Sequence, residues 1–202
     1  MKLPLLLTLL VVVATGSAYA DDGPFGLRWG ATEKDLVEQG VIFKKESDEG
    51  GFETFITTSL PKNLSIADMY VLLVHKKYEL QKVVMFSKEI EGDIYGTKGK
   101  EIYQDLKSKL VNKYGAPNSD FEKVGVELFT ETNEFYQCLA YDGCGYWSAM
   151  FSDKDKGILV SLQLKGIGRG KGFVKLAYEG PDWEEAMEES NSELSKSDAG
   201  VL

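Results

Sequence analysis

The sequence predicts an α+β fold in which two helices pack on a mostly antiparallel sheet. Two groups of short segments have the apolar patterns of strands, and turn residues separate the segments within each group. A segment with helical periodicity or helix-end signals precedes each group. The predicted order is therefore a helix, four strands, a second helix, about five strands and an acidic C-terminal helix or tail.

The first helix is expected to begin after Thr32, because residues 32–35 have the form of a capping box. It carries Leu36 and Val37 and ends at Gly40. The four strands predicted after it cover residues 41–46, 52–58, 69–76 and 79–88. Because the last two strands are apolar on both faces, they are expected to form a hairpin in the centre of the sheet.

The second helix is predicted over residues 99–114, where one apolar stripe recurs at three- and four-residue steps. The stripe consists of Ile102, Tyr103, Leu106, Leu110 and Tyr114. Gly115 and Pro117 then indicate the end of the helix. Further strands are predicted at 124–130, 133–140, 145–151, 158–164 and 172–178. The alternation in 158–164 indicates a sheet with one face toward water.

Residues 21–180 are interpreted as one α+β domain. The two helices end alike, with Leu-Val shortly before Gly40 and before Gly115. This likeness allows a division into two helix-then-meander units, 21–95 and 96–180. Since Leu-Val before a helix-ending Gly is a short match, chance is favoured over duplication.

The first twenty residues have the pattern of a cleavable secretory signal. Lys2 supplies a positive start, an apolar run follows from Leu3 to Ala14, and residues 18–20 read Ala-Tyr-Ala. The alternative is a membrane anchor, but the run is short for a bilayer and no basic flank follows it. The mature chain is expected to begin at Asp21, to contain no transmembrane segment, and to be periplasmic or secreted.

The charge of the chain argues against a nucleic-acid partner. Without Lys2, 22 Lys and Arg stand against 32 Asp and Glu, a net charge of −10. A phosphate backbone would be repelled, and no basic stripe is interleaved with aromatic residues. Residues 181–202 hold seven acidic residues and one Lys. This segment is interpreted either as a helix that docks on a basic partner or, preferably, as a weakly packed helix that frays from Ser195 onward.

Cys138 and Cys144 are expected to form a disulfide bond after export. Asp142-Gly143 between them is a tight-turn signal, so the two cysteines are predicted to face each other across the neck of a hairpin. Such a small ring stabilises the chain by about 2 kcal/mol. The bond is therefore expected to shape a loop more than to hold the fold.

Sequence patterns for catalysis, metals and cofactors were not found. His75, the one histidine, lies in an apolar strand and is interpreted as structural. No nucleophile elbow and no helical His pair for zinc is present. Residues 165–172 are rich in Gly and basic residues but match no phosphate-binding motif, and they are interpreted as a flexible hairpin tip.

The segment 135–147 is the most distinctive, with five aromatic residues around the two cysteines. One interpretation is a stapled hairpin whose aromatic residues face the core. The other is a rigid recognition loop that presents Tyr141 and Asp142, because a pre-ordered loop binds at a lower entropy cost. Tyr146 or Trp147 would extend this binding surface, although strand alternation sends only one of the two outward.

An exported α+β protein with a short Cys-to-Cys loop, then a Gly and a strand, is similar to the periplasmic inhibitors of vertebrate-type lysozyme. The likeness covers about a dozen residues. In that family the constrained loop carries a His that enters the lysozyme cleft. Here the ring is longer by one residue, and no His lies between Cys138 and Cys144. The resemblance implies an inhibitor that acts through a stapled loop.

Two function classes follow from the sequence. The favoured one is an exported, non-enzymatic binding protein of the bacterial envelope, such as an inhibitor- or immunity-like partner of a secreted hydrolase. Its partner would be another envelope or secreted protein. The alternative is an envelope hydrolase or transferase with an unrecognised carboxylate site. A protruding loop would favour the first, and a deep pocket with convergent carboxylates would favour the second.

Overall fold

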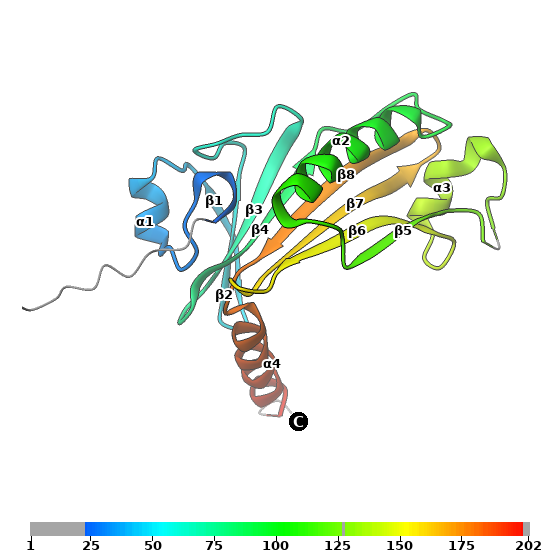
Figure 1. The fold of residues 1–202 in the computed structure, drawn as a ribbon. Coiled ribbons are helices and arrows are strands. Elements are labelled where there is room, and N and C mark those ends of the chain that lie inside the picture. The colour runs from blue at the N-terminus through cyan, green and yellow to red at the C-terminus, as the bar shows by residue number, and fades with distance from the viewer. Residues whose placement is uncertain (1–22, 127, 200–202) are drawn as a thin grey trace, which may run out of the picture.

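The computed structural model describes residues 23–126 and 128–199. The predicted signal peptide lies outside them. The described chain is a mixed α+β structure built on an antiparallel sheet of eight strands, as Figure 1 shows. The strands are β1 (Lys44–Glu49), β2 (Phe52–Thr57), β3 (Ala67–His75), β4 (Glu79–Ser87), β5 (Ser119–Lys123), β6 (Tyr146–Asp153), β7 (Ile158–Gly168) and β8 (Lys171–Glu179). The α-helices are α1 (Glu33–Glu38), α2 (Thr97–Tyr114), α3 (Phe135–Ala140) and α4 (Trp183–Ala199).

From each edge of the sheet to its centre, the strands follow one another in chain order. The strand order is β1-β2-β3-β4-β8-β7-β6-β5, so each group of four strands forms a meander. The last strands of the two meanders, β4 and β8, pair antiparallel in the centre. Thus β4 is central, as the sequence predicted for the segment 79–88.

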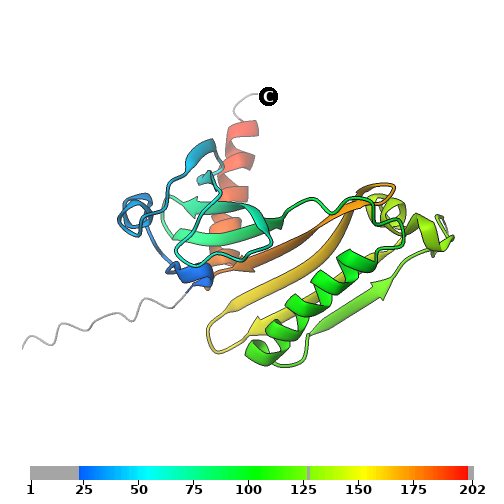
Figure 2. The same cartoon turned by 90° about the horizontal axis from the view of Figure 1, so that it is seen from above.

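Helices α2 and α3 lie on one face of the sheet, where α2 packs against β6, β7 and β8 and α3 packs against β7. The hydrophobic core lies on this face, and we call it the helix face. Phe55, Leu72, Phe151 and Leu162 point into the core and are fully buried. Helix α4 extends from the opposite face (Figures 1 and 2), which we call the open face. Among the described residues, no helix is both long enough and apolar enough to cross a membrane.

Both helices predicted on the sheet, α1 and α2, are present. The Thr32 hydroxyl accepts a hydrogen bond from the Asp35 N–H, and the Asp35 carboxylate accepts one from the Thr32 N–H, which completes the predicted capping box of α1. Helix α2 begins at Thr97, two residues before the predicted start. Within its apolar stripe, Tyr103, Leu106 and Leu110 are buried.

Two strand predictions in the second half are wrong. Residues 135–140 form helix α3 instead of the predicted strand 133–140, because Glu131 and Glu134 form a capping box that starts a helical turn. The preceding strand is β5, and it lies before the predicted range 124–130. The predicted hairpin neck at the cysteines is therefore also wrong, since the segment 138–144 joins a helix to a strand.

The glycine-rich segment is more ordered than predicted. Strands β7 and β8 continue through it and leave a turn at Arg169-Gly170. A Cβ atom added at Gly166 would lie 1.9 Å from the Tyr136 carbonyl oxygen, so α3 packs directly on this backbone. Lys171, one of its basic residues, pairs with Glu89 and Glu91. The segment is thus a packed part of the sheet.

The C-terminal segment forms helix α4 from Trp183 to Ala199, and the fraying expected from Ser195 onward stays a prediction. Ala186 and Ser190 are buried, whereas Leu194 is 46% exposed. Trp183 contacts the Phe52 ring with 5.4 Å between ring centroids. The first turns of α4 therefore carry most of its packing on the sheet.

Candidate functional site

The predicted disulfide bond is present, with Cys138 and Cys144 joined at an S–S distance of 2.06 Å. Cys138 lies on α3, and the ring closes just before β6. Asp142-Gly143 forms the turn between them, where Gly143 has a φ of 85°, a conformation that favours glycine. The Cys144 N–H donates to the Tyr141 carbonyl oxygen. Tyr141 and Asp142 are both exposed on this turn.

The disulfide ring also fastens a second segment, the connection that follows β5. The Gly125 N–H donates to Cys138 Sγ at 3.1 Å, and the Val126 N–H donates to the Cys144 carbonyl oxygen at 3.1 Å. The rings of Phe129 and Tyr141 lie 6.0 Å apart in an edge-to-face arrangement. The two loops therefore form one unit, in which two hydrogen bonds and a ring contact hold the second segment to the disulfide ring.

Large apolar side chains are exposed on and beside this unit. They are Phe121, Val126, Leu128, Tyr141 and Tyr146, with exposed fractions between 49% and 61%. We call these five residues the tip patch. Phe121 comes from the edge strand β5 and Tyr146 from its neighbour β6, and the strand register places both on the face opposite α2 and α3, the open face. The sequence did not predict Phe121, Val126 or Leu128 as members of this surface. Their positions depend on the register of β5 against β6 and on the loop that follows β5, and a local sequence pattern shows neither.

Of Tyr146 and Trp147, the structure turns Tyr146 outward and Trp147 inward. Tyr146 is 61% exposed. Trp147 packs against the core and contacts the Phe135 ring with 5.2 Å between centroids. Its ring thus helps to hold α3 on the sheet, and the part that Trp147 would take in binding stays a prediction.

His75 is buried on the open face under α4 and serves the fold. Its Nδ1 accepts hydrogen bonds from the N–H groups of Lys77 and Tyr78, at 3.2 and 3.3 Å, which fixes the turn between β3 and β4. Burial lowers the pKa of His75 below its ordinary value, and this effect outweighs the opposite influence of Glu189 and Glu193. These contacts agree with the structural role predicted for this residue.

No family model, curated protein or solved structure matches this chain. Its function has to be argued from its own side chains.

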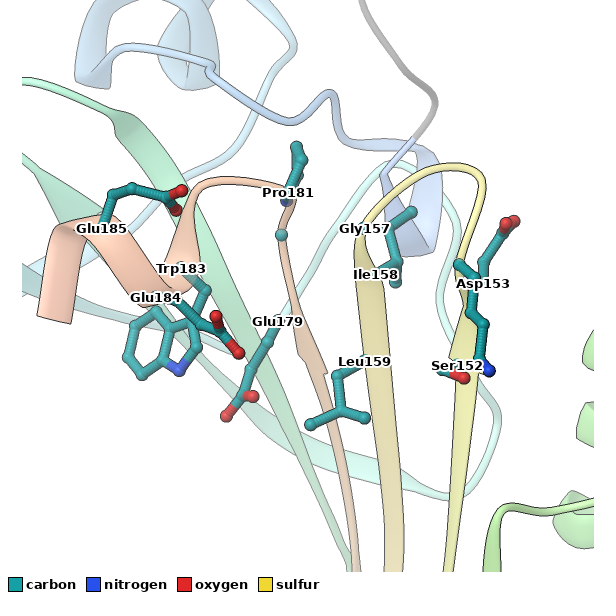
Figure 3. A pocket seen from close by; sticks show the side chains of 12 residues that line it. Ser152, Asp153, Gly157, Ile158, Leu159, Glu179, Pro181, Trp183, Glu184 and Glu185 are labelled. Atoms are coloured by element: carbon teal, nitrogen blue, oxygen red, sulfur yellow. The ribbon is translucent and has the colours of Figure 1, made fainter.

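The best-formed pocket, with a volume of about 380 Å³, lies where α4 leaves the sheet (Figure 3). Trp183, Leu159 and the carboxylates of Glu179 and Glu184 line it. Lys82 Nζ lies 2.7 Å from Glu179 Oε1 and 4.2 Å from the centre of the Trp183 ring. Because Glu179 and the Trp183 ring already have Lys82 as their cationic partner, we assign these groups to the docking of α4.

A second hollow lies beside α1, and it contains the carboxylates that the hydrolase alternative would need. Glu33, Glu53 and Glu79 line it. Burial, with Asp35 and Glu53 nearby, raises the pKa of Glu79, whose backbone φ of 61° is unusual for this residue type. His75 also lines the hollow, but its Nδ1 is occupied by the turn and its Nε2 lies beside Gly51. The geometry therefore offers carboxylates without an imidazole base directed at them.

Among the described residues, no group of three or more His, Cys, Asp or Glu side chains is arranged to hold a metal ion. The tip patch remains as the candidate functional site. It presents aromatic and aliphatic side chains, with the carboxylate of Asp142 beside them, on an ordered support.

Proposed function

We propose that the protein is an exported, non-enzymatic binding protein of the bacterial envelope, and that it recognises another envelope or secreted protein through the tip patch. The observation that carries this proposal is the exposure of five large apolar side chains on and beside the disulfide ring and the loop bound to it. Exposed apolar clusters of this kind are typical of interaction sites. Tyrosine is enriched among the residues that dominate such interfaces.

The support beneath the patch favours tight binding. Ordering a free loop on association costs about 0.5–1.5 kcal/mol for each flexible side chain that is fixed. Here the Cys138–Cys144 bond and the hydrogen bonds from Gly125 and Val126 hold the backbone in place before a partner arrives. Since a partner finds the surface already formed, an inhibitor- or immunity-like role toward a secreted hydrolase is our preferred form of the proposal.

The proposed location is the periplasm or the medium, because a disulfide persists in oxidising compartments. We expect the protein recovered from its native compartment to begin at Asp21 and to remain in the supernatant without detergent. Intact-mass measurement after cell fractionation checks both points. A mass that includes residues 1–20, together with recovery in the membrane fraction, would contradict the signal-peptide assignment.

The binding function is tested on a partner captured from an envelope extract with the disulfide-bonded protein. We expect Tyr141→Ala to weaken binding to this partner by about 1–2 kcal/mol or more, because an exposed aromatic anchor loses its contact area. Asp142→Ala and the double variant Cys138→Ser/Cys144→Ser should also weaken it, the latter by loosening the support. Titration calorimetry gives the affinities.

Ile42→Ala is the matched control, since Ile42 is 87% exposed and lies near β1, at the opposite edge of the sheet from β5. This variant should bind normally. The melting temperature of each variant shows whether the fold is intact. Normal binding by both Tyr141→Ala and Asp142→Ala would assign the loop a structural role and refute the proposal.

A further inference from the structure

The open face of the sheet carries half-buried apolar side chains with no helix above most of them. Across β3, β4, β7 and β8 the outward positions alternate with the core positions, as the strand registers require. The apolar residues at these outward positions are Met69, Val71, Leu73, Phe86, Leu159 and Phe173. Helix α4 covers one end of this face, where Trp183 contacts Phe52 and Lys82 and lines a pocket with Leu159. A sheet layer of this composition is typical of a surface that packs against another element.

Three lysines cross the same face along a diagonal. Lys82 is paired with Glu179 across β4 and β8, Lys175 is opposite Phe86 and Gln163, and Lys165 is opposite Phe173. Among the described residues, Lys82 has its carboxylate partner in Glu179, whereas no carboxylate is bonded to Lys165 or Lys175. Burial, then the charges of Lys82 and Lys165, lowers the pKa of Lys175. The centre of the open face is therefore a positive stripe in a chain of negative net charge.

Helix α4 has the complementary charge and projects from the open-face side of the molecule (Figures 1 and 2). Glu184, Glu185 and Glu188 are exposed on it. Glu189 is already paired with Lys77. With 17 residues the helix is about 25 Å long. The lysine stripe runs over six residues of β8, or about 20 Å, so the two charged features have similar lengths.

We propose that the open face is the interface with a second copy of this chain, and that α4 of each copy lies across the lysine stripe of the other. We assign a second copy of the chain to this face for two reasons. The chain supplies both the basic face and the exposed acidic helix, and α4 is about as long as the lysine stripe that it would cover. A reciprocal contact of this kind closes as a two-fold dimer. The contact gives Lys165 and Lys175 carboxylate partners and covers the apolar residues around them.

Lys165, at one end of the stripe, lies beside Tyr146 of the tip patch, and both line one small hollow. The variant Glu184→Lys/Glu188→Lys leaves the tip patch unchanged, so the dimer and the proposed recognition of another protein can fail independently. The oligomeric state is measured by sedimentation velocity on the exported, disulfide-bonded protein over a range of concentrations. We expect a dimer at micromolar concentrations that dissociates as salt is raised, because the contact is largely electrostatic.

Charge reversal provides the decisive test. Lys165→Glu/Lys175→Glu and Glu184→Lys/Glu188→Lys should each raise the dimer dissociation constant by about tenfold or more, because like charges then face each other. An equal mixture of the two variants should restore a dimer, since each reversed helix meets a reversed face. A variant that failed to fold could not give this rescue.

Lys62→Glu/Lys98→Glu is the control, because it makes the same change in net charge at two exposed lysines of the described chain that make no ion pair. It should leave the dimer intact. A wild-type protein that stays monomeric at every concentration would overturn the proposal. So would a dimer that the reversed variants do not weaken, or two weakened variants that do not associate when mixed.

Discussion

Replacing Asp93 with Ala is expected to lower the free energy of unfolding by about 3 kcal/mol or more, because it removes a buried charged acceptor from two elements at once. Asp93 is 6% exposed. Its Oδ2 accepts a hydrogen bond from the Gly99 N–H at 3.0 Å and one from the Tyr136 hydroxyl at 2.9 Å. The carboxylate thus joins the first turn of α2 to α3. Chemical denaturation at neutral pH measures the loss.

The pH dependence of this effect has a definite sign. Burial by itself raises the pKa of Asp93. Hydrogen bonds to its carboxylate lower the pKa by a larger amount in total, so the pKa lies below its ordinary value; the donors are Gly99, Tyr136 and the N–H groups of Lys98 and Thr97. The stabilisation is therefore present above the unfolded-state pKa and is lost as the pH falls through the folded-state pKa. The difference between wild type and Asp93→Asn should accordingly shrink in acid.

Two variants separate this role from a general effect of charge. Asp105→Ala removes an exposed carboxylate of α2 that pairs with Lys109 on the surface, and it should cost less than about 1 kcal/mol. Tyr136→Phe keeps the ring and removes one hydrogen bond to Asp93, so an intermediate loss is expected. Equal losses in Asp93→Ala and Asp105→Ala, or a difference from wild type that does not change with pH, would contradict the assignment.

The second large effect is expected at Gly166, where Ala should destabilise the protein by about 3 kcal/mol. An added Cβ atom would lie 1.9 Å from the Tyr136 carbonyl oxygen and 2.8 Å from the Ala140 nitrogen. Both atoms belong to the backbone of α3, so a rotamer change cannot relieve the clash. The helix has to move away from β7, and thermal unfolding should show a lower melting temperature.

Gly168→Ala is a close control, because Gly168 lies on the same strand and an added Cβ atom there meets nothing within 4 Å. Its stability should stay near that of wild type, within about 0.5 kcal/mol. The Gly166→Ala variant should also exchange the amide hydrogens of α3 faster than wild type does. If both variants melt alike, α3 does not need the close approach that the structure describes.

The sequence predicted those elements whose local pattern is long enough to be read. Helix α2 has five turns and a repeated apolar stripe, and β7 alternates over most of its length, so both were placed within a few residues. Helix α3 has six residues, fewer than two turns, so its pattern does not repeat, and its aromatic residues resemble those of a strand. Strand β5 is almost wholly exposed, and it is defined by its pairing with β6.

The candidate site could be predicted only in the part that is formed by residues close together in the sequence. The disulfide bond and the exposed turn at Tyr141 and Asp142 follow from residues six positions apart. Phe121 and Leu128 enter the tip patch through strand register and through contacts of the ring with a distant loop, which no sequence window contains. The lysine stripe likewise joins residues from three strands, and the strand order of the sheet brings them together.

The pairing of β4 with β8 has a consequence for how the chain acquires its structure. The central ladder joins residues such as Lys82 and Glu179, which are 97 positions apart. Until β8 is available, β4 and β7 both end the sheet as apolar, unpaired edges that invite association with other chains. The first meander must therefore wait for the last strand, and the complete sheet forms only after nearly the whole polypeptide has been made. Non-local pairing of this kind is slow, so the new chain depends on protection of these edges during that delay.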